Sequence, residues 1–145
     1  MVDITSKPKV YREAKAKGII KLKPETIQLI KDGRIEKGDL FEVAKVAGIL
    51  AAKNTSILIP LCHPLPLTGV EIKLKTVACS KVEAEATIKT RAQTGVEMEA
   101  LAAVATALLT VWDMTKQYEK DMEGQYPSTS IQDLHVVKKM KRKQE

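Results

Sequence analysis

Residues 69–89 decide the fold, and their sequence is GVEIKLKTVACSKVEAEATIK. Apolar and polar side chains alternate over residues 70–75 and again over residues 82–89, which is the period-two pattern of strands with one face in water. The short gap at residues 78–81 separates the two runs, as is typical of an antiparallel hairpin. We therefore predict a β-hairpin with one wet face at the centre of the fold.

The segments on either side of this hairpin predict helices and two outer strands. In chain order these segments are a strand at 18–22, a short helix that starts at Pro24 and stops at Asp32-Gly33, a helix capped by Asp39 over 40–51, a helix at 96–122 and a strand at 131–137. Strand, helices, strand, strand, helix, strand is the split βαβ order of ferredoxin-like folds. The prediction is an α+β fold with a four-stranded antiparallel sheet and helices packed on one face.

The chain of 145 residues has the size of one domain, which we place at residues 18–137. Residues 1–17 are expected to form an N-terminal arm and residues 138–145 a basic C-terminal tail. The formal net charge of +6 is concentrated in these two ends, because the arm carries +3, the tail +4 and the middle −1. A continuous basic face for nucleic acid is therefore not expected.

The chain carries only two cysteines, Cys62 and Cys79, which do not make a disulfide framework. No secretory leader opens the sequence. The longest apolar run, residues 100–112, is shorter than the roughly 20 residues that span a bilayer. We expect a cytoplasmic protein that does not enter a membrane.

A stiff, apolar segment at residues 57–67 holds three prolines and the run Leu61-Cys62-His63. A histidine fixed in such a segment can bind a ligand or exchange a proton near neutral pH, or it can simply pack against a backbone partner. Cys62 and His63 are adjacent and point apart in an extended chain, and no ligand pair with zinc spacing accompanies them. No metal site is predicted.

Two groups of charged residues flank the apolar run 100–112. Glu97 and Glu99 lie in the first turn of the helix, where they favour the helix dipole or meet a polar ligand, and about 200° separates them around the axis. Asp113 and Lys116 lie three residues apart after the run. They form either a surface ion pair or an acid–base pair in which the apolar surroundings depress the pKa of Lys116.

Glu99 and Asp113 are fourteen residues apart, about 21 Å along a straight helix. One small pocket in a single chain cannot use both, so either the ligand is long or two subunits share the site. Because residues 100–112 are apolar on every side, part of that helix is expected to face another subunit. We favour the shared site and expect a homo-oligomer.

Taken together, these motifs resemble the cyclic pyranopterin monophosphate synthase family, the C proteins of molybdenum cofactor biosynthesis. The resemblance spans nearly the whole chain. It rests on Asp3-Ile4-Thr5 with Lys7, Arg12-Glu13-Ala14, Asp32-Gly33 with Lys37-Gly38-Asp39-Leu40-Phe41, residues 47–53, Ile59-Pro60-Leu61-Cys62-His63-Pro64-Leu65, Thr94-Gly95-Val96-Glu97-Met98-Glu99-Ala100-Leu101 and Asp113-Met114-Thr115-Lys116.

The resemblance implies an enzyme that converts 3′,8-cyclo-7,8-dihydro-GTP into cyclic pyranopterin monophosphate and releases pyrophosphate. It implies a hexamer built as a trimer of dimers, with the active site at the dimer interface. By the same resemblance Asp113 and Lys116 are catalytic. The residues expected to bind substrate are Leu61, Cys62, His63, Met98 and Glu99, joined by Glu97 and, for the triphosphate, by Lys37, Lys53 and Arg12.

No cofactor is expected, apart from a possible Mg²⁺ on the substrate phosphates. Lys139 aligns with the last-strand lysine of the family, but the tail lacks the glycines that many members carry. A pterin-binding regulatory domain without catalysis is the alternative from another class. An RNA-binding module shares the element order, yet the hairpin strands have no aromatic side chains on which bases could stack.

Overall fold

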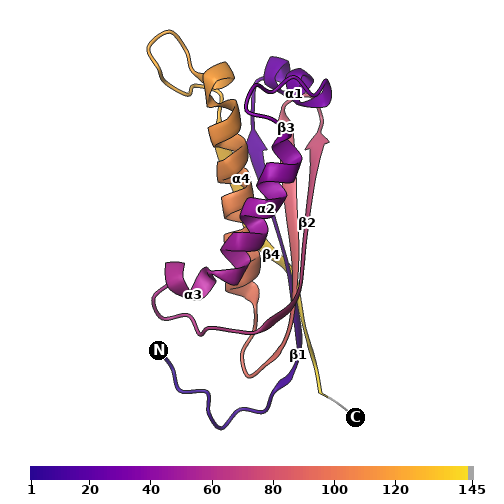
Figure 1. Ribbon diagram of the computed structural model, residues 1–145, viewed down its shortest axis with the longest axis vertical. Coiled ribbons are helices and arrows are strands. Elements are labelled where there is room, and N and C mark those ends of the chain that lie inside the picture. Colours follow the sequence, from indigo (N-terminus) through magenta and orange to yellow (C-terminus); the bar gives the residue numbers. More distant parts are fainter. Residues whose placement is uncertain (144–145) are drawn as a thin grey trace.

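The computed structural model describes residues 1–143 and has two layers, a sheet and the helices that cover one of its faces (Figure 1). The expected helix capped by Asp39 is present, and the carboxylate of Asp39 accepts a hydrogen bond of 3.2 Å from the backbone N–H of Glu42. The elements in chain order are β1 (Val10–Lys21), α1 (Pro24–Lys31), α2 (Leu40–Lys53), α3 (Thr55–Leu58), β2 (Leu67–Val77), β3 (Lys81–Ala92), α4 (Glu97–Glu119) and β4 (Ser130–Arg142).

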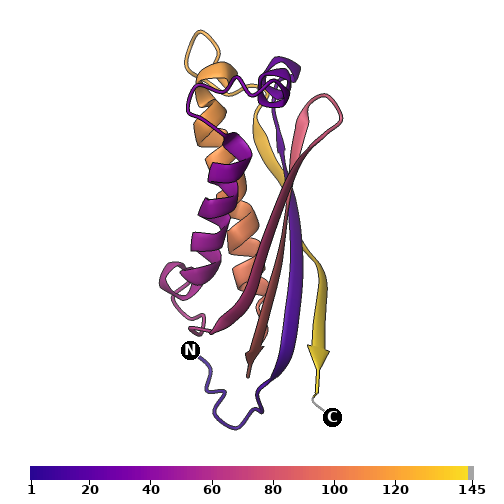
Figure 2. The ribbon, with the colours of Figure 1, turned by 45° about the vertical axis from the view of Figure 1, so that its right-hand side comes forward.

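The four strands form one sheet in the order β2-β3-β1-β4, and each neighbouring pair is antiparallel. The predicted hairpin is present as β2 and β3, with a tight turn in which Ala78 has a positive φ of 55°. Helices α2 and α4 run side by side along one face of the sheet (Figure 2). The predicted ferredoxin-like α+β fold is confirmed.

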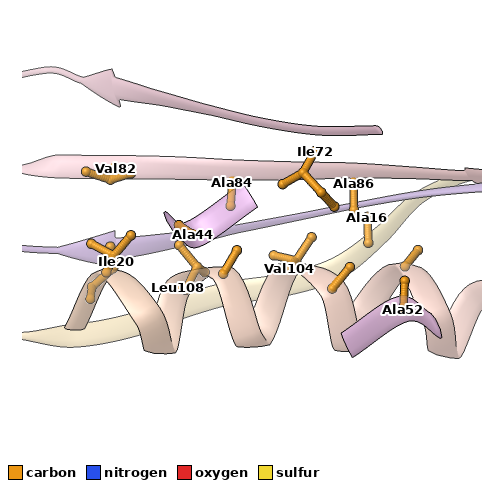
Figure 3. Packing of buried hydrophobic residues seen from close by; sticks show 14 of the residues in the cluster. Ala16, Ile20, Ala44, Ala52, Ile72, Val82, Ala84, Ala86, Val104 and Leu108 are labelled. Carbon is orange, nitrogen blue, oxygen red and sulfur yellow. The ribbon is translucent and has the colours of Figure 1, made fainter. Parts of the chain in front are cut away.

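The core lies between the sheet and α4, and the sheet contributes mainly small side chains to it. Two glycines mark where the layers come closest. A Cβ at Gly18 of β1 would lie 2.9 Å from Cδ1 of Leu108, and a Cβ at Gly48 of α2 would lie 3.1 Å from the carbonyl oxygen of Ala103. Small residues therefore let α4 pack tightly on the sheet and on α2. The labelled core residues in Figure 3 are Ala16, Ile20, Ala44, Ala52, Ile72, Val82, Ala84, Ala86, Val104 and Leu108.

Helix α4 lies within the predicted range of 96–122 and extends beyond the apolar run at 100–112 on both sides. By length and composition alone it is apolar enough to cross a membrane, which the expectation from residues 100–112 did not foresee. In the fold, however, half of its most apolar window is buried, and Ala103, Val104, Ala107 and Leu108 are fully covered. We therefore interpret α4 as a core helix.

The C-terminal end of α4 is anchored by Glu119, a fully buried carboxylate. It accepts hydrogen bonds from the backbone N–H of Lys23 at 3.1 Å, from the hydroxyl of Thr129 at 2.7 Å and from the hydroxyl of Thr26. A buried polar group is tolerated when its hydrogen bonds are satisfied in this way. Glu119 thus ties the start of α1 and the segment before β4 to the end of α4.

Both predicted domain boundaries need correction. The expected arm at 1–17 is shorter, because β1 begins at Val10 and pairs with β3 over its whole length. The expected basic tail is largely strand, because β4 continues to Arg142 and its last residues pair with the start of β1. The start of β1 gave only a weak strand pattern in the sequence, because the inward-facing residues of this strand are mostly alanine and glycine. Residues 144 and 145 of the tail lie outside the described residues.

The segment at residues 57–67 also differs in part from the expectation. It was predicted to be extended throughout, but its first two residues belong to the short helix α3. The remainder, before β2, has no regular structure, as its prolines indicate.

The outer face of the sheet is covered with charged side chains. Lys15 pairs with Glu85 at 3.4 Å, and Lys17 pairs with Glu85 at 3.4 Å and with Glu83 at 3.7 Å. These pairs lie on the two central strands, where an RNA recognition motif needs aromatic rings for stacking. The structure therefore does not favour the RNA-binding alternative.

Candidate active site

The site residues predicted from the sequence fall at the two opposite ends of α4. We refer to the cluster of Asp113, Lys116 and Lys37 as the lysine end, and to the cluster of Glu99, Cys62 and His63 as the thiol end. Figure 1 shows the α1–α2 connection, which carries Lys37, and the segment after α3, which carries Cys62 and His63, at opposite ends of that helix.

At the lysine end, two ammonium groups converge on one carboxylate. Nζ of Lys116 lies 2.9 Å from Oδ1 of Asp113, one turn away on α4. Nζ of Lys37 lies 3.1 Å from Oδ2 of the same residue and 3.0 Å from its carbonyl oxygen. The Asp113 side chain is 58% exposed, so the cluster is open to a ligand from solution.

The contacts at the lysine end shift the pKa values of Asp113 and Lys116 in the directions that keep these two groups ionised. Hydrogen bonds from Lys116 and Lys37 lower the pKa of Asp113. The hydrogen bond and the charge of Asp113 raise the pKa of Lys116. A depressed pKa for Lys116 was one of the two interpretations of this pair from the sequence. The free protein does not support it, because this side chain extends into solvent beside a carboxylate and is not buried against the apolar helix.

At the thiol end, Glu99 points into the protein and is only 3% exposed. Its Oε1 faces Sγ of Cys62 at 3.9 Å, while its Oε2 has no hydrogen-bond partner among residues 1–143. Burial raises the pKa of Glu99, and burial together with the nearby Glu99 raises the pKa of the Cys62 thiol. A buried carboxyl oxygen without a partner is costly, which makes Glu99 a candidate for contact with a ligand.

The remaining members of the 61–63 run lie close to the surface. His63 is half-buried, and its Nε2 lies 2.7 Å from the carbonyl oxygen of Val2 in the N-terminal segment. Leu61 and Met98 are exposed apolar side chains. Both interpretations of His63 stay open, because Nε2 has a backbone partner while no hydrogen bond to the second ring nitrogen is found within residues 1–143.

Glu97 belongs to a third neighbourhood, as the angle of about 200° between it and Glu99 predicted. Its carboxylate pairs with Lys139 of β4 at 3.0 Å. Burial acts to raise the pKa of Glu97, but its own backbone N–H, Lys139 and Arg12 together lower it. Arg12 is held beside it by hydrogen bonds to the carbonyl oxygens of Ala92 and Gln93 at 3.4 and 3.1 Å.

Lys53 lies at the C-terminal end of α2, far from Lys37. It lines a shallow pocket with Ile49, Leu65 and Leu67 and forms no ion pair with residues 1–143. One chain therefore does not bring the two predicted phosphate-binding lysines together. The contact of Lys37 with Asp113 was not foreseen, because 76 residues separate them and no local pattern signals it.

Among the described residues, no group of three or more His, Cys, Asp or Glu side chains is placed to hold a metal ion. A Mg²⁺ ion carried on substrate phosphates would not need such a group. Its presence with the substrate stays a prediction.

The fold and these clusters define a ferredoxin-like α+β protein whose long helix presents the ion-paired Asp113 at one end and the buried Glu99 at the other. Comparison with known proteins narrows this class further. The family model described as "MoaC family" matches residues 1–141, and the chain belongs to that family.

Several relatives are similar over nearly their whole length. The chain is 56% identical over 143 residues to the "Probable cyclic pyranopterin monophosphate synthase" of Pyrococcus horikoshii, which covers 97% of this chain and 88% of the relative. The protein of the same name from Pyrococcus abyssi is 57% identical, with the same coverage. That of Sulfurisphaera tokodaii is 53% identical over 141 residues, covering 97% of this chain and 93% of the relative.

Proposed function

We propose that this protein is a cyclic pyranopterin monophosphate synthase of molybdenum cofactor biosynthesis. Its substrate is 3′,8-cyclo-7,8-dihydro-GTP, and its products are cyclic pyranopterin monophosphate and pyrophosphate. Family membership and the names of the relatives support this assignment. The structural observation that carries it is the lysine end, where Asp113 lies between two cationic groups in solvent-accessible surroundings.

The reaction requires a hydroxyl group of the substrate to attack the phosphorus nearest the sugar. A new P–O bond forms, the bond to the bridging oxygen breaks, pyrophosphate leaves, and the hydroxyl proton passes to a base. Asp113, whose pKa is lowered, is an ionised acceptor for such a proton. Lys116 and Lys37 are cationic and can balance the charge that builds on the phosphate oxygens. Because its pKa is raised, Lys116 enters the reaction as an acid.

The rest of the substrate needs a different set of groups. Several cations must hold a triphosphate, and we assign this role to Lys37, Lys53 and Arg12. We assign the ring system to Leu61, Cys62, His63, Met98 and Glu99. In this arrangement the buried carboxyl of Glu99 receives the hydrogen bond that its Oε2 lacks in the free chain.

We propose that two copies of the chain build each site, one giving its lysine end and the other its thiol end. The separation of the two ends along α4 supports this arrangement. Apolar side chains exposed on α2, namely Val43, Val46 and Leu50, offer a surface that a second copy can cover. We propose a hexamer that is a trimer of such dimers. Light scattering at micromolar concentration should show no stable monomer, and a monomer would contradict the shared site.

We further place the protein in the cytoplasm, with no role for nucleic acid or a membrane. Both cysteines are free, in keeping with a reducing compartment.

The direct test is incubation with the cyclised GTP intermediate, followed by measurement of pyrophosphate and of the cyclic phosphate product. Stoichiometric release of both supports the synthase. Tight binding of the intermediate without turnover would point to the regulatory alternative instead, and the Asp113→Ala variant would then bind as the wild type does.

A further inference from the structure

The N-terminal segment, residues 1–9, is not part of the sheet, yet it folds back to the thiol end of α4. Figures 1 and 2 show the N-terminus near the segment that follows α3. A hydrogen bond links the two segments: the carbonyl oxygen of Val2 lies 2.7 Å from Nε2 of His63. The contact connects the N-terminal segment, which has no role in the proposed function, to His63, which is assigned to substrate binding.

The shape of this segment is set by its own hydrogen bonds. The carboxylate of Asp3 accepts from the backbone N–H of Thr5 at 2.8 Å and from its hydroxyl at 2.6 Å. The backbone N–H of Lys7 closes the following turn on the carbonyl of Ile4 at 2.9 Å. Aspartate side chains commonly form such turns. The Asp3-Ile4-Thr5 motif therefore gives the segment a defined turn next to Val2, whose carbonyl faces His63.

A backbone carbonyl can only accept a hydrogen bond, so Nε2 of His63 must be the donor. In a neutral imidazole the other nitrogen, Nδ1, then carries no proton and has a free lone pair. No hydrogen bond from residues 1–143 to Nδ1 is found. The contact with Val2 therefore leaves an acceptor on the side of the ring that is free for a ligand.

We propose that the N-terminal segment is a positioning element of the active site, which fixes the ring orientation and the Nε2–H tautomer of His63. Nδ1 is then presented as a hydrogen-bond acceptor to an N–H or O–H group of the substrate. This inference rests on the proposed function for the part that concerns substrate. The contact and the tautomer themselves do not depend on it.

The second histidine offers an internal reference within the same molecule. Nδ1 of His135 lies 2.6 Å from the carbonyl oxygen of Asp133 on β4. By the same argument Nδ1 is the donor there, and His135 holds the opposite tautomer. The two histidines of this chain should therefore give two different patterns of ring nitrogen signals when both are neutral.

The test is ¹⁵N NMR of the full chain with labelled histidine, in mildly alkaline buffer where imidazoles are neutral. We expect His63 to show a protonated Nε2 and an unprotonated Nδ1, with the Nε2 proton protected from exchange and close to Val2. His135 should show the reverse. A protonated Nδ1 on His63, or an Nε2 proton that exchanges freely in the wild type, would overturn the proposal.

Removal of residues 1–4 should expose the Nε2 proton of His63 to exchange, shift its ring signals and leave those of His135 unchanged. Turnover should fall about tenfold, as expected when a substrate-binding group loses its fixed orientation. Val2→Ala keeps the backbone carbonyl and is the matched control, with wild-type spectra and turnover. Full turnover in the truncated protein, despite altered His63 signals, would contradict the positioning role.

A pair of amide substitutions tests the same assignment without shortening the chain. An asparagine amide at position 63 reaches the place of Nδ1, whereas a glutamine amide reaches the place of Nε2. We expect His63→Asn to retain more turnover than His63→Gln, and the opposite order would contradict the assignment. If the wild type shows no turnover at all, the proposed function fails while the NMR result still decides whether the contact with Val2 exists.

Discussion

The two ends of α4 carry carboxyl groups that are the same in chemistry and opposite in surroundings. Asp113 lies in solvent between two ammonium groups, and its pKa is lowered. Glu99 lies inside the protein with one unpaired oxygen, and burial raises its pKa. One end therefore offers a charged acceptor, and the other a group that tends to keep its proton. Carboxyl groups whose pKa values are pushed apart in this way are typical of acid–base sites.

The largest expected effect comes from breaking the charged end. Asp113→Ala and Lys116→Ala should each lower the turnover rate by roughly 10²-fold or more, because each removes a positioned acid–base group. The double variant should be little worse than either single one, since the two residues act as a unit. Steady-state kinetics checks this, with circular dichroism and light scattering to show that the variants stay folded and assembled.

A matched ion pair on α2 supplies the control for this experiment. Lys45 lies 3.2 Å from Glu42 at the same spacing of three residues, away from both ends of α4. Lys45→Ala should leave turnover unchanged. Near-wild-type turnover in a folded Lys116→Ala protein would reduce the pair of Asp113 and Lys116 to an ordinary surface ion pair.

A smaller effect is expected from replacing either of the two predicted phosphate-binding lysines, and the turnover rate should distinguish the two variants. Lys37→Ala and Lys53→Ala should each weaken substrate binding about tenfold, as expected for loss of one charge-assisted contact, and more strongly at low salt. Only Lys37 also touches Asp113, so Lys37→Ala should lower the turnover rate as well. Separate measurement of kcat and KM over a range of salt checks this. If both variants bind substrate as the wild type does, the phosphate pocket lies elsewhere.

The smallest effect concerns stability at the buried end. Because the pKa of Glu99 is raised, the folded state binds this proton more tightly than the unfolded chain does. Its contribution to stability is present below the ordinary pKa of 4.5 and is lost as the pH rises through the raised value. Glu99→Gln cannot ionise, so at mildly alkaline pH it should gain on the order of 1 kcal/mol in the free energy of unfolding.

Urea unfolding of wild type and variant at several pH values measures this difference. Glu97→Gln, two residues away, is the control: because the pKa of Glu97 is lowered, its contribution to stability is fully present above about pH 4.5 and is lost as the pH falls through the lowered value, so this variant should be less stable than wild type by a constant amount above pH 4.5. A Glu99→Gln protein that loses stability relative to wild type as the pH rises would contradict the buried, proton-retaining environment.

The regular patterns of the sequence predicted most of the fold. The alternation at 70–75 and 82–89 located the hairpin, and Pro24 and Asp39 located two helix starts, because each of these signals is local. The two ends of the domain were harder to predict. The inward positions of β1 near its start include Ala14 and Ala16, which give little hydrophobic contrast, so the strand was taken for an arm. The lysine-rich end of β4, from residue 138 on, resembled a solvated tail until its pairing with β1 was visible.

The sequence motifs identified the candidate site residues, but they did not predict the burial and the ion pairs of these residues. Glu99 and Asp113 look equivalent in sequence, each beside an apolar run. In the structure Glu99 is buried and faces Cys62 of the segment after α3, whereas Asp113 receives its second cation from Lys37 of the α1–α2 connection. Such contacts join residues far apart in the chain. The same holds for Val2 and His63, which lie 61 positions apart.

The central claim is that each active site combines the lysine end of one copy with the thiol end of another. Asp113→Ala and Glu99→Ala proteins, both expected to be inactive alone, can be mixed under conditions that exchange subunits. With random pairing, each mixed dimer has one intact site, so the mixture should regain about one quarter of wild-type turnover. A mixture of Asp113→Ala with Lys116→Ala, both at the same end, should stay inactive. If the first mixture is as inactive as its components, each site lies within a single chain and the claim is wrong.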